Sequence, residues 1–259
     1  MKSPACRPSQ PRLAAALLLL LLGLATAGPA AAEPAGQIRT LLITGGHGFE
    51  EAAFYQVFQT NTDLIFAHTS HAKTNGGTPL ATAFDQPGLL NHEVVVLYDM
   101  PRDLTDSQKA GFRSLFDHGV GLVVLHHALV SYQHWPEYER IIGGRYPEAD
   151  GKGGVVTDAV GYQHDVEVPV VIVARDHPIT AGLTDFTIHD EIYWGFRTAP
   201  NLTVLATTTH PKSGKPLAWC RTEGRSRIVY LQFGHDHQAY ENPNYQRLLA
   251  QSIRWAAHR

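Results

Sequence analysis

Two short segments of the chain consist almost entirely of apolar residues, and this feature constrains the fold most. Residues 93–98 read EVVVLY and residues 121–125 read GLVVL. A strand with one face in water alternates apolar and polar residues, whereas these runs leave no polar face. Segments with helical periodicity stand before and between them, at residues 50–61 and 106–118. The pattern therefore predicts an α/β fold, a mostly parallel sheet with helices on both faces.

The second half of the chain has a different pattern. Residues 146–165 are rich in Gly, Asp and Pro and are predicted to form a long loop. Short apolar segments follow at residues 165–174, 186–192, 204–208, 217–221 and 227–233, before a closing helix at residues 244–258. We expect several of these strands to be antiparallel additions to the sheet. No repeat or interdomain linker is visible, which predicts a single domain over residues 33–259.

The first 32 residues have the features of a secretory signal peptide. Lys2, Arg7 and Arg12 precede an apolar run at residues 13–25, and the alanines at 30–32 match a small-residue cleavage site. The unbroken apolar core is shorter than the roughly 20 residues that a spanning helix needs. We therefore expect a mature chain that starts near Glu33, has no membrane span, and is exported to the bacterial periplasm or secreted.

Charge and cysteine content exclude two further classes. The formal net charge is −3, which gives no basic surface for a nucleic acid. Cys6 lies in the predicted signal peptide, so the mature chain has only Cys220 and cannot form an internal disulfide. The 15 histidines are many for 259 residues, and their positions matter more than their number. The oligomeric state is left open.

Three predicted strands end in histidine. Strand 39–44 is followed by His47, strand 121–125 by His126 and His127, and strand 228–233 by His235. The carboxyl ends of parallel strands meet at one edge of a sheet, where open α/β folds bind their ligands. We therefore expect these imidazoles to share one site.

Such a site could hold a metal ion or perform acid–base catalysis. His47, His126 and His235 are the candidate ligands of a divalent metal ion such as zinc. The chain has no HExxH or CxxC motif, so no cofactor is certain. As a catalytic site, His126 or His127 would be the base, His235 its partner, and Glu191 or Asp236 the acid. Other histidines, among them His68, His71, His118 and His258, are expected to have capping or hydrogen-bonding roles.

Aromatic residues close to these segments are candidates for substrate binding. Tyr193 follows Glu191 in the segment DEIYW at residues 190–194, and Trp135 lies shortly after the double histidine. Aromatic faces commonly line carbohydrate sites, which makes Trp135 and Tyr193 candidate contacts of a small-molecule carbohydrate. The alternative for residues 190–194 is a half-exposed strand with no site function.

Seven short motifs together give the chain a family resemblance. In chain order they are TGGH at 44–47, LHHA at 125–128, GGRY at 143–146, DHPI at 176–179, DEIY at 190–193, PLAW at 216–219 and GHD at 234–236. Over residues 38–259 the chain resembles the trehalose-utilisation (ThuA-like) family. The resemblance implies a flavodoxin-like sheet similar to that of class I glutamine amidotransferases, in which the turn after the central strand presents a cysteine. Here His126 and His127 occupy that turn, so amidotransferase thioester chemistry is excluded by residue type.

The resemblance also implies a role in bacterial sugar catabolism, including routes that oxidise a disaccharide to its 3-keto form. The first hypothesis is an exported carbohydrate-active enzyme, a hydrolase or lyase. It would cleave or rearrange an oxidised (3-keto) glycoside by histidine and carboxylate acid–base chemistry, with or without a metal ion. The alternative is a non-catalytic module that binds a sugar or a protein. Turnover separates the two hypotheses, because a binding module leaves its ligand unchanged.

Overall fold

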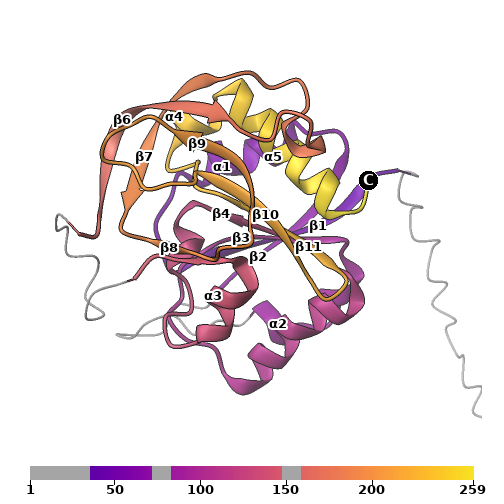
Figure 1. Cartoon of the computed structure of the whole chain (residues 1–259). Coiled ribbons are helices and arrows are strands. Elements are labelled where there is room, and N and C mark those ends of the chain that lie inside the picture. Colours follow the sequence, from indigo (N-terminus) through magenta and orange to yellow (C-terminus); the bar gives the residue numbers. More distant parts are fainter. Residues whose placement is uncertain (1–35, 72–82, 148–158) are drawn as a thin grey trace, which may run out of the picture. The chain divides into compact units, whose positions relative to one another are not determined.

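The computed structural model describes residues 36–71, 83–147 and 159–259 (Figure 1). The described residues form a large mixed sheet with the strand order β2-β1-β3-β4-β11-β10-β9-β6-β7. All neighbours from β2 to β11 are parallel, and all neighbours from β11 to β7 are antiparallel. The predicted α/β fold with antiparallel additions is thus confirmed.

The parallel half of the sheet consists of β1 (Ile38–Gly45), β2 (Leu64–Ser70), β3 (Val94–Asp99), β4 (Gly121–Leu125) and β11 (Ser226–Leu231). The antiparallel half consists of β6 (Gly161–Ile172), β7 (Phe186–Trp194), β9 (Thr203–Thr208) and β10 (Ala218–Glu223). A separate short pair, β5 (Gly144–Arg145) and β8 (Arg197–Thr198), lies outside this sheet.

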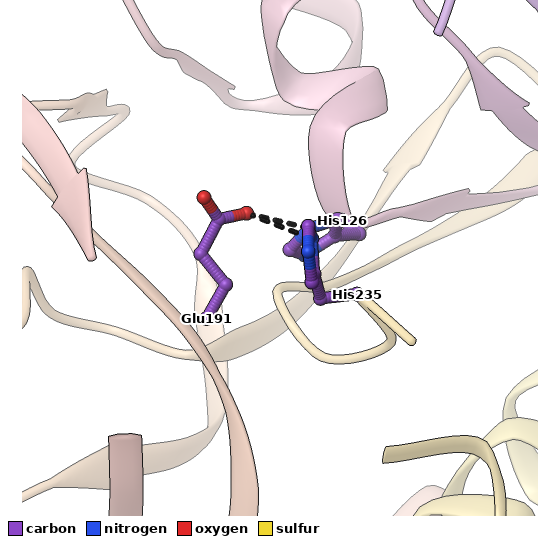
Figure 2. A group of neighbouring side chains, drawn as sticks. All are labelled: His126, Glu191 and His235. Carbon is purple, nitrogen blue, oxygen red and sulfur yellow. Dashed lines mark hydrogen bonds and ion pairs between the residues drawn. The ribbon is translucent and has the colours of Figure 1, made fainter. Parts of the chain in front are cut away.

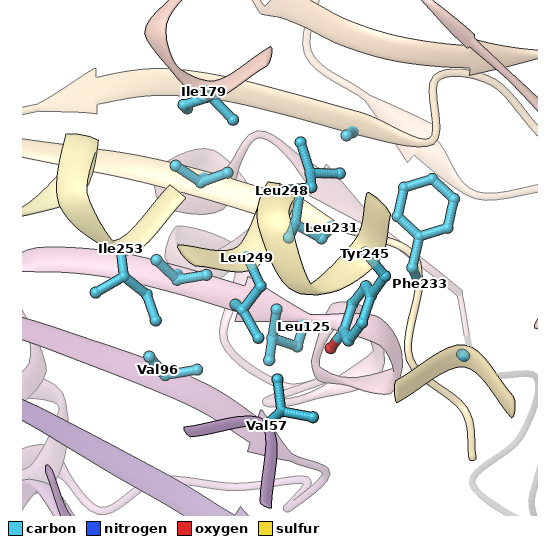
Figure 3. Packing of buried hydrophobic residues seen from close by; sticks show 14 of the residues in the cluster. Val57, Val96, Leu125, Ile179, Leu231, Phe233, Tyr245, Leu248, Leu249 and Ile253 are labelled. Carbon is cyan, nitrogen blue, oxygen red and sulfur yellow. The ribbon is translucent and has the colours of Figure 1, made fainter. Parts of the chain in front are cut away.

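Helices cover both faces of the sheet (Figure 1). One face carries α1 (Glu51–Gln59), α4 (His237–Tyr240) and α5 (Pro243–Ala256), and the other carries α2 (Asp106–His118) and α3 (Pro136–Ile142). Every residue of β3 and of β4 is buried, as their unbroken apolar sequences predicted. On the α5 face, Leu248 and Ile253 pack in the same core cluster as Leu125 and Leu231 (Figure 3).

Local sequence signals set the ends of α2. Thr105 and Gln108 form a reciprocal capping box at its start, because each side chain bonds to the backbone N–H of the other residue. Gly119 ends the helix with φ of 76°, a left-handed conformation that glycine adopts without steric cost. The predicted bounds of this helix, residues 106–118, are therefore those observed.

The prediction of a loop over residues 146–165 is wrong for its last residues. Strand β6 begins at Gly161, and residues 148–158 lie outside the described part of the chain. Gln163 pairs with Ile192 and Val166 with Asp190, so two residues of β6, His164 and Asp165, oppose only one on β7. This β-bulge interrupts the alternation that a strand prediction depends on.

The predicted signal peptide, residues 1–32, also lies outside the described residues. Within the described ranges, no helix combines the length and the apolar character that crossing a bilayer requires.

Candidate active site

The turn after β4 has an unusual backbone conformation. Its first residue, His126, has φ of 49°, although it is not glycine. This left-handed conformation costs about 1–2 kcal/mol for a residue with a Cβ atom, and such strain is commonly found at functional sites. The short 3₁₀ helix His126–Val130 then leads the chain away from the sheet. The sharp turn implied by the family resemblance is thus present, and it places a buried imidazole at the strand end.

Three side chains from three segments meet at this turn (Figure 2). His126 Nε2 lies 2.9 Å from Glu191 Oε2, His235 Nδ1 lies 3.3 Å from the same oxygen, and the two nitrogens are 3.3 Å apart. We call this group, His126, Glu191 and His235, the His–Glu–His cluster. Two of its members follow the ends of β4 and β11, as the strand-end argument predicted.

Glu191 reaches the cluster through contacts between β7 and the loop after β11. The preceding residue, Asp190, is buried, and its carboxylate accepts hydrogen bonds from the backbone N–H groups of Gly234 and His235 at 2.8 and 3.0 Å. Although β7 is the last strand of the sheet order, these bonds fasten it to the segment that carries His235. Asp190 therefore positions two members of the cluster, a role that the sequence analysis did not assign to it.

Hydrogen bonds define the orientation of His126. Its Nδ1 lies 2.6 Å from the backbone carbonyl oxygen of Gln232, and the hydroxyl of Tyr193 lies 2.9 Å from its Nε2. Tyr193 also packs its ring on the imidazole, with centroids 5.0 Å apart. The phenol predicted to contact substrate is thus buried and hydrogen-bonded to the cluster itself.

The cluster shifts the ionisation of its members in opposite directions. Burial alone would raise the pKa of Glu191, but the hydrogen bonds and charges of His126 and His235 outweigh it and hold this pKa well below the usual value. The hydrogen bond to Glu191 raises the pKa of His235 above its ordinary value. Glu191 is therefore a carboxylate at neutral pH, which disfavours the role of general acid expected for it.

His127 and His47 form a second pair of imidazoles beside the cluster. Their ring centroids are 4.5 Å apart, and His127 also packs on Tyr98 at 4.3 Å. His127 is buried, and neither of its ring nitrogens has a hydrogen-bond partner among the described residues. Burial, together with the charges of His126 and His47, holds the pKa of His127 well below its ordinary value. His127 is thus a neutral imidazole at physiological pH.

A fifth imidazole, His164, joins the site from the bulge of β6. Its Nδ1 lies 3.5 Å from Glu191 Oε1, and its ring centroid lies 4.4 Å from that of His235. The sequence analysis missed this residue because it lay in the predicted loop. The bulge, which Asp165 supports with φ of 56°, turns His164 toward the site.

Other predicted site residues lie elsewhere or have structural roles. The carboxylate of Asp236 caps α4 by accepting from the backbone N–H of Gln238. Trp135 is buried in the core on the α2 face, where it packs on Phe112 and its Nε1–H donates to Glu137. The packing of Trp135 therefore does not support its predicted role in substrate binding. The predicted metal ligand His47 packs against His127 with its ring tilted, and the potential ligand group is instead the His–Glu–His cluster.

Cys220 lies away from the cluster, in a small cavity of about 240 Å³ that it shares with His177 and Trp255. Its Sγ lies 3.6 Å from His177 Nε2, but burial raises the pKa of the thiol to about 11. A thiol with such a pKa stays protonated at neutral pH and is a poor nucleophile.

Comparison with known proteins identifies first the fold and then the family. The chain is similar to a ThuA-like protein from Parabacteroides merdae, with a TM-score of 0.72, 21% identity and coverage of 85% of this chain and 90% of the other. A ThuA-like protein from Bacteroides uniformis has a TM-score of 0.61, 19% identity and coverage of 88% and 95%. A β-galactosidase from Rahnella sp. R3 has a TM-score of 0.55 and 11% identity, and the match covers 84% of this chain but 31% of that enzyme. At these identities the likenesses show a shared fold.

The family model of trehalose utilisation (ThuA) matches residues 42–256, and the chain belongs to this family. No curated protein matches the chain by sequence.

Proposed function

We propose that this chain is an exported enzyme of sugar catabolism that cleaves an oxidised (3-keto) glycoside by elimination. The family's link to trehalose utilisation supports a carbohydrate substrate. The observation that carries the proposal is the composition of the site, in which one ionised carboxylate is paired with several imidazoles. Such a set of groups suits proton removal next to a ketone better than it suits direct hydrolysis of a glycosidic bond.

Ordinary glycoside hydrolysis calls for two carboxyl groups that flank the scissile bond. Two acids besides Glu191 act on His235 through their charge, but Asp190 is buried and bonded to backbone N–H groups, and Asp236 caps a helix. Only Glu191 remains, and it is held between imidazoles. The site therefore has no second carboxyl group placed for that reaction among the described residues.

The proposed reaction needs only proton transfers. A ketone at C3 makes the hydrogen on C2 acidic, so a base can remove it and leave an enolate. The electron pair of the enolate then forms the C1–C2 double bond as the C1–O bond breaks. The departing oxygen takes up one proton, and the products are an alcohol and an unsaturated keto sugar. Atoms and electrons balance without an oxidant or a reductant.

The structure suggests a division of roles among the imidazoles. His127 is the base, because burial lowers its pKa and keeps it neutral and because it lies next to His126 at the turn. His235 is partly exposed and has a raised pKa, so in the metal-free site it donates a proton toward the developing negative charge. His127 and His235 each pack against His126, and their pKa values shift in opposite directions, as those of many acid–base pairs do.

A nitrophenyl 3-keto glucoside, tested as both anomers, gives a direct assay. The mature protein should release nitrophenol from one 3-keto anomer and not from the parent glucoside, which lacks the acidic hydrogen. The matched variant His127→Gln should slow release by about 10²–10⁴-fold, the usual loss for a general base. Equal rates on the keto and parent sugars would overturn the proposal. Tight binding of the keto sugar without turnover would favour the binding-module alternative.

A further inference from the structure

The His–Glu–His cluster places three electron-pair donors around one point. The backbone oxygen of Gln232 can only accept a hydrogen bond, so His126 Nδ1, 2.6 Å away, carries the proton. In the neutral ring, Nε2 then has a lone pair, and this nitrogen lies 2.9 Å from an oxygen of Glu191. His235 Nδ1 completes the triangle at 3.3 Å from both atoms. Such close electron-pair donors repel one another unless a proton or a metal ion lies between them.

We propose that His126, Glu191 and His235 bind one divalent transition-metal ion, with zinc as the first candidate. The inference deepens the proposed function, since the ion would replace the proton as the positive charge of the cluster. Metal binding itself can be measured without any sugar, so it can be tested independently of the reaction.

The triangle has the size that zinc requires. Its three sides are 2.9, 3.3 and 3.3 Å. A point about 0.9 Å above its plane lies about 2.05 Å from each corner, within the range of zinc–nitrogen and zinc–oxygen bonds. Three ligands on one side of the ion leave the opposite side open, as in catalytic zinc sites with two histidines and one glutamate. One carboxylate and two imidazoles suit zinc or iron better than calcium or magnesium.

The residues around the cluster supply the hydrogen-bond partners that metal-binding histidines usually have. A ligating imidazole typically donates its other N–H to a carbonyl or carboxylate, as His126 does to Gln232. The other oxygen of Glu191 faces His164 Nδ1 at 3.5 Å, and Asp190 fixes the backbone of His235. These contacts hold the three donors in place and reduce the entropy lost when an ion binds.

The test measures zinc on the full mature chain after chelator treatment and dialysis against zinc chloride. We expect one zinc ion per chain by mass spectrometry of the metal content, and a higher melting temperature than that of the stripped protein. Glu191→Gln and His235→Gln should each weaken zinc binding in titration calorimetry by more than about 100-fold, beyond the usual effect of a second-layer change. Circular dichroism shows whether each variant is folded, and the partly exposed His235 gives the safer variant.

His47→Gln is the matched control. Its imidazole lies beside the cluster, packed against His127, and is not among the proposed ligands. This variant should keep one zinc ion with unchanged affinity. The proposal is overturned if the folded wild-type chain binds zinc no better than Glu191→Gln, or if His47→Gln loses zinc as His235→Gln does. Turnover of a 3-keto glycoside by a wild-type chain that binds no zinc would overturn the metal site alone, whereas stoichiometric zinc without turnover would overturn the proposed reaction alone.

Discussion

Replacing Glu191 by Gln removes one negative charge from the cluster with almost no change in shape. The carboxylate lies 3.3 Å from His235 Nδ1, and its hydrogen bond is the main reason that the pKa of His235 is raised. At an effective dielectric constant of about 20, two unit charges at this distance attract by about 5 kcal/mol. Measured effects of one adjacent opposite charge are smaller, about 1–3 pKa units. The side chain of His235 is 24% exposed, so water screens part of the attraction.

We therefore expect the pKa of His235 to fall toward its ordinary value in Glu191→Gln, because the hydrogen bond to the carboxylate is the largest cause of its rise. The assay is a titration of the histidine ring signals by NMR on chelator-treated protein, because a bound metal ion would prevent protonation. Glu167→Gln is the matched control, since Glu167 contacts His189 at 2.8 Å but is 68% exposed. Water screens the attraction in such an exposed pair, so the pKa of His189 should fall less in Glu167→Gln than the pKa of His235 falls in Glu191→Gln. An unchanged pKa of His235, or a larger fall at His189, would refute this account of the cluster.

Three further predictions test other parts of the account. In Cys220→Ser, turnover should persist. As the pH rises, the free energy of unfolding of this variant should fall less than that of the wild type. The thiol pKa of about 11 lets the folded state keep its proton while the unfolded chain loses it from about pH 9. Between about pH 9 and pH 11 the free energy of unfolding of the wild type should therefore fall by up to about 1.4 kcal/mol per pH unit more than that of the variant. Urea unfolding at several pH values measures this difference, and an equal dependence on pH in both proteins would contradict a buried thiol. Gly46→Ala should lose more than about 1 kcal/mol of stability, because Gly46 has φ of 85° and a Cβ atom would lie 2.6 Å from the carbonyl carbon of Met100. The control Gly48→Ala, with nothing within 4 Å, should change stability by less than about 0.5 kcal/mol, and equal losses would refute the steric argument. Mass spectrometry of the exported protein should find a first residue near Glu33, and a retained Met1 would contradict export.

The core of the fold could be predicted because its strands and helices have simple sequence patterns. The unbroken apolar runs of β3 and β4 allow no solvent-exposed face, and both strands are fully buried. The start of α2 could be predicted because Thr105 precedes the helix and its side chain satisfies a backbone N–H at the first turn. These signals depend on residues close together in the chain.

The site could be predicted only in part, since its composition depends on contacts between distant segments. The strand-end rule correctly placed His126 and His235 together. It named His47 as the third metal ligand, whereas the third member of the potential ligand group in the structure is Glu191. Glu191 reaches the cluster only because Asp190 bonds to the backbone after β11. His164 depends on a bulge, and a shift of pairing within a strand leaves no periodic signal in the sequence.

The most direct test of the proposed function follows the hydrogen on C2. The mature protein is incubated with a 3-keto glycoside in D₂O, and the sugar is followed by proton NMR together with the released alcohol. The account predicts that the unsaturated keto sugar and the alcohol appear together, and that substrate recovered early carries deuterium at C2 wherever proton removal is reversible. His127→Gln should remove both signals while the protein remains folded. Cleavage by the wild type that yields the intact 3-keto sugar with its C2 hydrogen retained would contradict elimination through an enolate.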